Sequence, residues 1–78
     1  MIVRYFAGAA EAAGRKEQQH PGDVTVAELK ARLSDEHGEE FARVLTACSV
    51  LVDGTRATDE TFAPTGATVD VLPPFAGG

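Results

Sequence analysis

A chain of 78 residues buries only about 60–65% of its unfolded surface, so little material is left for an enclosed active site. Its composition, 44% hydrophobic and 24% charged with 6% aromatic residues, is that of an ordinary globular protein, and no apolar run approaches the roughly 20 residues of a membrane span. The small size therefore favours a carrier, an adaptor or one subunit of a larger catalyst over a self-contained enzyme. The net charge of −5 and the lack of a basic face disfavour nucleic acid as a partner.

The N-terminal segment predicts a β-hairpin. Residues 1–6 (MIVRYF) are rich in β-branched and aromatic side chains and favour a strand. In residues 7–14 the alanines favour a helical turn and the glycines a structured loop, and both interpretations stay open. Residues 15–20 are polar and fit a second, edge strand, which Pro21 and Gly22 then end.

The most clearly marked element is a helix that begins after Thr25. Thr25 and Glu28 form a capping-box pattern, in which the Thr hydroxyl accepts a backbone N–H and the Glu side chain reaches back. Gly38 is the expected end of this helix. Apolar residues at helical spacing predict its buried face: Val26, Leu29 and Leu33. Residues 39–46 favour a short second helix, whose buried pair would be Phe41 and Leu45.

The C-terminal half predicts short strands joined by turns. Residues 48–52 favour a buried strand, and Asp53-Gly54 is a strong hairpin signal that leads into a short strand at residues 55–57. Residues 68–72 (TVDVL) alternate and favour the last strand, which Pro73 ends. Two further segments are expected to be turns: residues 59–62 and residues 64–66.

This order of strands and helix indicates an α+β fold. We expect one mixed sheet of about four to five strands with one main helix packed across one face. The first and last strands are the most apolar and should lie side by side at its centre. This arrangement is the β-grasp, or ubiquitin-like, fold. Residues 1–78 would form a single such domain, with residues 73–78 as an extended C-terminal tail.

The tail sequence PPFAGG carries the clearest functional signal. Pro73 and Pro74 stiffen the exit from the sheet. Gly77 and Gly78 have no side chains and can pass where a Cβ would clash. A terminal Gly-Gly carboxylate could therefore enter the narrow active site of another protein and be activated there as an acyl-adenylate. The alternative is that these glycines are merely a frayed end, as many termini are.

Motifs along the whole chain resemble one family. They are VRYFA at residues 3–7, EAAG at 11–14, VAEL at 26–29, VDG at 52–54 and, above all, VLPPFAGG at 71–78. With these motifs the chain resembles the small, sulfur-carrying subunit of molybdopterin synthase. That subunit is one of the ubiquitin-like sulfur carriers, a group that also includes the thiamine-pathway carrier.

The resemblance implies a cycle of activation and sulfur transfer at Gly78. An E1-like enzyme would adenylate the Gly78 carboxylate, and sulfur would replace AMP to give a C-terminal thiocarboxylate beside Gly77. The large catalytic subunit, in a heterotetramer with this chain, would then use the sulfur to build the dithiolene that holds molybdenum. The chain has no phosphate-binding glycine loop, so ATP belongs to the activating partner and we expect this chain to bind no cofactor. The residues expected to contact these partners are Phe6, Leu72, Pro73, Pro74, Phe75 and Ala76.

Four residues depart from the family pattern. Phe75 stands where a small or β-branched residue is common, Ala67 where an acidic residue is common and Asp53 where asparagine is common. Arg56 stands where an apolar interface residue can occur. Phe75 bears on the fit of the tail to its channel and Arg56 on the docking surface, while Gly77 and Gly78 are unaffected.

Other candidate sites have simpler explanations. From the residues alone, Phe6 and Leu72 fit core or half-buried strand positions better than an exposed patch. Cys48 could relay sulfur, but a strand cysteine is usually a small buried hydrophobe. His20 and His37 lie apart, with no cysteine pair or carboxylate spacing nearby, so we expect no metal site.

The leading hypothesis is therefore the sulfur-donor subunit of molybdopterin synthase, which would not be an enzyme on its own. The N-terminus shows no secretory leader and the single cysteine can form no internal disulfide, so we expect a cytoplasmic protein without membrane contact. Two alternatives remain: a carrier that feeds another pathway, such as thiamine, cysteine or a specialised metabolite, and a non-catalytic β-grasp interaction module. The acidic pairs Asp35-Glu36 and Glu39-Glu40 fit either a solvated helix face or contact with a basic partner.

Overall fold

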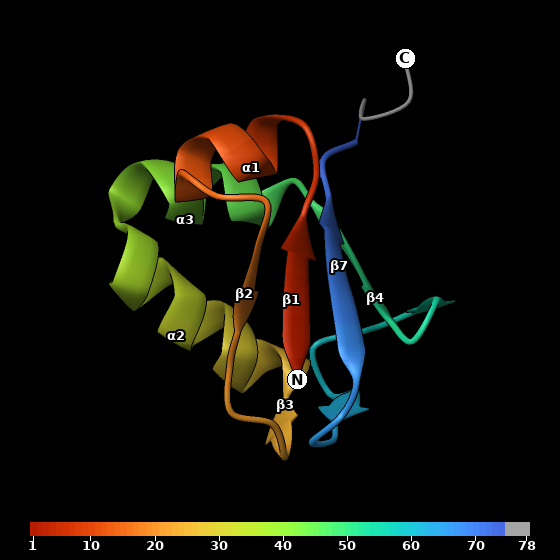
Figure 1. The fold of residues 1–78 in the computed structure, drawn as a ribbon. Helices are drawn as coiled ribbons and strands as arrows, with labels where there is room; N and C mark the ends of the chain where they lie inside the picture. Colours follow the sequence, from red (N-terminus) through yellow and green to blue (C-terminus); the bar gives the residue numbers. More distant parts are fainter. Residues whose placement is uncertain (75–78) are drawn as a thin grey trace.

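The computed structural model describes residues 1–74 of the chain. Helices α2 and α3 lie on one face of the main sheet, and α1 lies beside α3 at one end of it (Figure 1). No helix in the described part is long and apolar enough to cross a membrane. In chain order the elements are β1 (Ile2–Tyr5), α1 (Gly8–Ala13), β2 (Glu17–Gln19), β3 (Val24–Thr25), α2 (Val26–His37), α3 (Glu39–Thr46), β4 (Ser49–Val52), β5 (Thr55–Arg56), β6 (Phe62–Ala63) and β7 (Thr68–Leu72).

The main sheet has five strands in the order β2-β1-β7-β4-β5. β1 and β7 are parallel at its centre, with Val3 opposite Val69 and Arg4 opposite Asp70. The other neighbours, β1 with β2, β4 with β7 and β4 with β5, are antiparallel. The sequence-based expectation of an α+β, β-grasp fold with adjacent first and last strands is confirmed.

The core lies between this sheet and the helices. Val3, Tyr5, Val69 and Val71 point from the two central strands toward the helices and are almost completely buried. The helices contribute to the same core the apolar residues that the sequence predicted to be buried: Val26, Leu29, Leu33, Phe41 and Leu45. Because the strand side chains alternate between faces, the other half of them lies on a face that no helix covers.

The capping box of α2 forms as predicted. The Thr25 hydroxyl accepts from the backbone N–H of Glu28, and the Glu28 carboxylate accepts from the backbone N–H of Thr25 at 2.9 Å. Gly38 ends the helix with a φ of 96°, which favours glycine over any other residue. Local signals of this kind act within one turn, so the sequence alone locates the helix.

The structure corrects the predictions in three places. Residues 7–14, left open between helix and loop, contain the helix α1. The second strand is shorter than residues 15–20 and covers only Glu17–Gln19. The predicted turn at residues 59–62 is wrong at its end, because Phe62 pairs with Thr25 in a separate two-stranded sheet of β3 and β6. Pairing between residues so far apart leaves no local pattern in the sequence.

Candidate functional site

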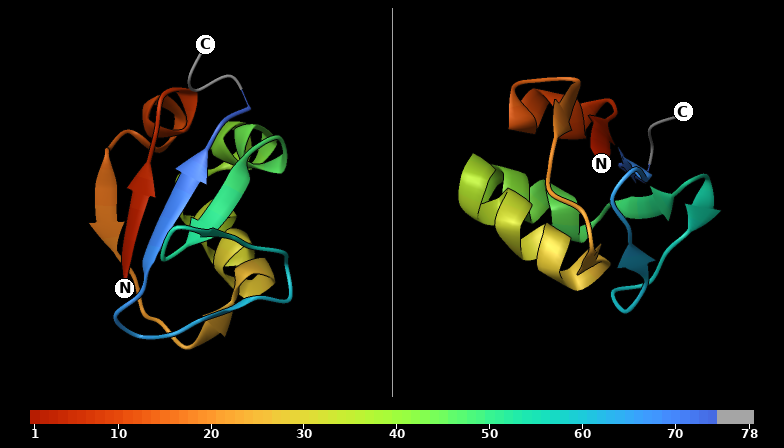
Figure 2. Two further views of the ribbon diagram at one scale, coloured as in Figure 1. Left: turned by 90° about the vertical axis from the view of Figure 1, so that its right-hand side faces the viewer. Right: turned by 60° about the horizontal axis from the view of Figure 1, so that its bottom comes forward.

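The candidate site is the sheet face that no helix covers, at the edge where β1 and β7 end. The helices lie on the other side of the sheet, as the two views of Figure 2 show. Ile2 and Arg4 of β1 and Phe6, just after it, alternate with the buried Val3 and Tyr5, so these three belong to the uncovered face.

The chain leaves the sheet at this edge. The backbone N–H of Phe6 donates to the carbonyl of Val71 at 3.2 Å, which extends the β1–β7 pairing to the end of the strand. Leu72 and Pro73 are half-buried, and Pro74 is exposed. The remaining predicted site residues lie outside the described residues, so their roles stay predictions: Phe75, Ala76, Gly77 and Gly78.

Phe6 does not join the core. Its side chain is 36% exposed on the uncovered face, and the Arg4 guanidinium lies 5.8 Å from the centre of its ring. Leu72, the last residue of β7, is half-buried. The interpretation of both residues as core or half-buried strand positions therefore holds for Leu72 and fails for Phe6. Phe6 and Leu72 therefore form an apolar pair on the uncovered face, where the tail begins.

An ion pair that the sequence analysis missed lies beside Phe6. Arg4 donates from Nε to one carboxylate oxygen of Asp70 at 2.6 Å and from Nη2 to the other at 2.9 Å. The hydrogen bond and the charge of Asp70 raise the pKa of Arg4, so the guanidinium stays charged. One signal was present in the sequence: Arg4 and Asp70 are the only charged residues in the two strands expected to be neighbours.

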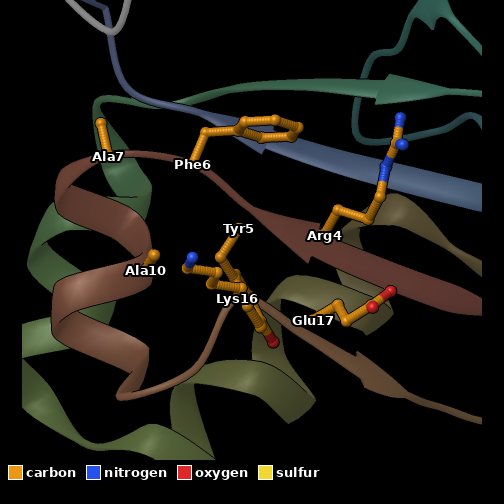
Figure 3. A pocket seen from close by; sticks show the side chains of 7 residues that line it. All are labelled: Arg4, Tyr5, Phe6, Ala7, Ala10, Lys16 and Glu17. Carbon is orange, nitrogen blue, oxygen red and sulfur yellow. The ribbon is translucent and has the colours of Figure 1, made fainter.

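A shallow hollow of about 480 Å³ opens next to these residues, between the end of β1, the helix α1 and the start of β2 (Figure 3). Three charged residues, Arg4, Lys16 and Glu17, and the aromatic Phe6 contribute to its lining. The complete lining is Arg4, Tyr5, Phe6, Ala7, Ala10, Lys16 and Glu17. The hollow is open to solvent and does not surround a small molecule as a typical ligand pocket does.

A hydrogen-bond network supports this edge from inside. The Tyr5 hydroxyl donates to Oε1 of Gln18 at 2.8 Å, and Nε2 of His37 lies 2.7 Å from the same oxygen. The Gln18 amide in turn donates to the carboxylate of Glu36. Burial, and next the charge of Glu36, raise the pKa of Tyr5 well above its usual range. These contacts join β1, β2 and the end of α2, so His37 has a structural role.

The remaining candidate residues are the histidines and Cys48. Within residues 1–74, no group of three or more His, Cys, Asp or Glu side chains could hold a metal ion. Cys48 is half-buried just before β4, and its thiol donates to the carbonyl of Val44 at 3.2 Å. Burial raises the pKa of Cys48, which keeps the thiol protonated and makes it a weak nucleophile.

The residues that depart from the family pattern have identifiable surroundings. Arg56 is exposed on β5 and donates to the hydroxyl of Ser49 at 3.0 Å. Asp53 has a φ of 49° in the hairpin turn and accepts from the backbone N–H of Thr68 at 2.9 Å. Ala67 is buried, so a charged residue would not fit this interior position.

The fold and the exposed edge beside the end of its central strand define a ubiquitin-like protein of the β-grasp class. The model of the ThiS family matches residues 3–78. The chain therefore belongs to the ThiS family, whose members are small ubiquitin-fold sulfur carriers. A comparison with curated proteins found no match.

Solved structures support the same fold. SAMP1 from Haloferax volcanii is 28% identical with a TM-score of 0.79, over 100% of this chain and 98% of that one. A second structure, of small archaeal modifier protein 1 from the same organism, is 26% identical with a TM-score of 0.77, over 95% of both chains. The Pyrococcus furiosus structure assigned as molybdopterin converting factor subunit 1 is 24% identical with a TM-score of 0.81 and shares 94% of each chain. At that identity the last comparison shows the fold alone.

Proposed function

We propose that this chain carries sulfur as a thiocarboxylate on Gly78 and is the sulfur-donor subunit of a molybdopterin synthase. The observation that carries the proposal is the place where β7 ends. Leu72 leads the chain off a central strand, beside the exposed Phe6, on the sheet face that no helix covers. Membership of the ThiS family and the VLPPFAGG sequence at residues 71–78 support it.

The proposed chemistry takes place at the main chain. In the active site of an E1-like enzyme the Gly78 carboxylate attacks the α-phosphate of ATP, and pyrophosphate leaves. Hydrosulfide from the sulfur donor then displaces AMP from the acyl-adenylate and leaves a thiocarboxylate on Gly78. The four residues after Pro74 span at most about 14 Å, so both the activating enzyme and the large subunit must sit close to the end of β7.

Intact-mass measurement tests this proposal. After incubation with its E1-like enzyme, ATP and a sulfur donor, the chain should gain about 16 Da, because sulfur replaces one carboxylate oxygen. A variant that lacks Gly78 should keep its fold and gain nothing. If the full chain never changes in mass while the activating enzyme is shown to be active, the carrier proposal is wrong, and a β-grasp interaction module becomes the better explanation.

The acceptor decides between the remaining alternatives. Reconstitution of the thiocarboxylated chain with a molybdopterin synthase large subunit should consume the sulfur, whereas a carrier for thiamine, cysteine or another metabolite should leave it unused. The likeness to small archaeal modifier protein 1 favours a second candidate, in which the activated Gly78 carboxylate is transferred to an amine of another protein. That product is an amide, and it would persist in denaturant as a covalent adduct.

A further inference from the structure

Arg4 and Asp70 form an ion pair on the uncovered face, between the end of β7 and the hollow. We propose that Arg4, held in place by Asp70, is a specificity-determining residue for the activating enzyme. It selects a partner surface that places a hydrogen-bond acceptor, a carboxylate or a backbone carbonyl, next to an apolar side chain in contact with Phe6. This inference rests on the proposed function, because it identifies the face with which the carrier meets its E1-like partner.

The position of the pair puts it within reach of that partner. Arg4 and Asp70 lie opposite each other in the parallel register of β1 and β7, and Phe6 and Leu72 follow them toward the tail. An enzyme that receives Gly78 must approach within about 14 Å of Pro74, which is the extended length of the intervening chain. Helices cover the other side of the sheet (Figure 2). The enzyme therefore meets the face that carries Arg4 and Phe6.

The two partners in the pair are unequally exposed. The Asp70 side chain is 11% exposed and both its oxygens accept from Arg4, whereas the Arg4 side chain is 48% exposed. Arg4 uses Nε and Nη2 in this pair, and its Nη1 has no hydrogen-bond partner among residues 1–74. Asp70 thus positions the guanidinium, and the free Nη1 edge remains available to a docked protein.

Docking removes the free Nη1 group of Arg4 from water, and this desolvation makes binding depend on what the partner places opposite Nη1. A partner that covers Arg4 removes water from Nη1, and an unpaired buried donor on a charged group is unfavourable. A partner surface that is entirely apolar is therefore rejected, while one with an acceptor opposite Nη1 is accepted. Glu17 lies opposite Arg4 on β2 and repels a second carboxylate from that side. A carboxylate on the partner should therefore approach on the side of Phe6.

Steady-state kinetics of thiocarboxylate formation test the inference, with the carrier as the varied substrate. The double variant R4L/D70V replaces the ion pair by two apolar residues that fit strand positions without changing the net charge. We expect the KM for the carrier to rise by about 10- to 100-fold with kcat unchanged, because the acceptor on the enzyme loses its donor. The R4K variant keeps the charge but loses the planar fork, and its KM should rise as well.

A matched control removes a different ion pair of the same chain. Lys30 and Asp59 pair at 2.9 Å between α2 and the loop before β6, away from the uncovered face. The K30L/D59V variant also leaves the net charge unchanged, and its KM should equal that of the wild type. Thermal unfolding of all variants, and binding to the activating enzyme without ATP, separate loss of docking from loss of fold.

Three results would overturn the inference. The first is a KM of R4L/D70V equal to that of the wild type. The second is an equal rise in KM for R4L/D70V and K30L/D59V. The third is a wild-type KM for R4K, which would mean that the positive charge alone, and not the planar guanidinium, is recognised. Failure of the proposed function gives a different result, since the wild-type chain itself would then gain no sulfur, and the inference would fall with it.

Discussion

The backbone N–H of Phe6 donates to the carbonyl oxygen of Val71, which joins the end of β1 to the strand that leads into the tail. The two residues are far apart in sequence, yet this contact sets an exposed aromatic side chain beside the point where the tail begins. Val71 faces the core while its neighbour Leu72 faces outward. Because the buried side chain of Val71 anchors the end of β7 in the core, it sets the point and the direction in which the chain leaves the sheet.

Phe6 should matter for docking more than for stability. Replacing Phe6 by alanine should cost less than the ~3 kcal/mol typical of truncating a buried phenylalanine, because the side chain is 36% exposed. If it is an anchor for the activating enzyme, the KM for the carrier should rise about tenfold. The control is Phe62→Ala, since Phe62 is 56% exposed on β6, away from the end of β7. Equal effects of the two substitutions on KM would contradict the prediction.

Tyr5 is the single tyrosine of the chain, so tyrosinate absorbance reports on it alone. Burial raises its pKa above the ordinary 10.0, so the neutral phenol stabilises the fold at neutral pH and this contribution is lost as the pH rises above that value. We expect no phenolate signal near pH 10.0 in the folded chain, and a signal that appears together with loss of circular dichroism at higher pH. In denaturant, Tyr5 should titrate normally. Ionisation of Tyr5 in an intact fold near pH 10.0 would show the prediction to be wrong.

The capping box makes stability depend on pH at the acidic end. The hydrogen bond from the Thr25 backbone N–H, and next that from its hydroxyl, lower the pKa of Glu28 below 4.5. The carboxylate therefore stabilises the fold above this pH, and the contribution is lost as the pH falls through the lowered pKa. Glu28→Gln should flatten the fall of the unfolding midpoint below pH 4.5, measured by chemical denaturation. Glu60→Gln, an exposed loop substitution, should leave that slope unchanged.

Gly22 permits a close approach between two loops. A Cβ at this position would lie 2.5 Å from both the Cα and the backbone nitrogen of Thr65, and backbone atoms cannot move aside as a flexible side chain can. Gly22→Ala should therefore destabilise the fold by about 1–3 kcal/mol, measured as a lowered midpoint of thermal or urea unfolding. Gly8→Ala is the matched control. A Cβ there meets nothing within 4 Å among the described residues, so stability should be unchanged or slightly raised.

The sequence was sufficient wherever the information is local. Thr25, Glu28 and Gly38 mark the two ends of α2 through contacts within a single turn, and the apolar residues between them repeat at helical spacing. The alternation of residues 68–72 likewise identifies β7. The PPFAGG tail is a sequence signal in itself, and its last four residues lie outside the described part of the structure.

Only the tertiary structure decided which distant residues meet. The β3–β6 pair consists of two residues from each strand, too few for a pattern, and it depends on the loops that Gly22 and Thr65 bring together. The parallel register of β1 and β7 places Arg4 against Asp70, 66 positions along the chain. A shift of one residue between the two strands would have placed Arg4 and Asp70 on opposite faces of the sheet. Sequence alone therefore located most of the elements and the PPFAGG tail. The register of β1 and β7 decided that Arg4 lies against Asp70 and that Phe6 lies where the tail begins.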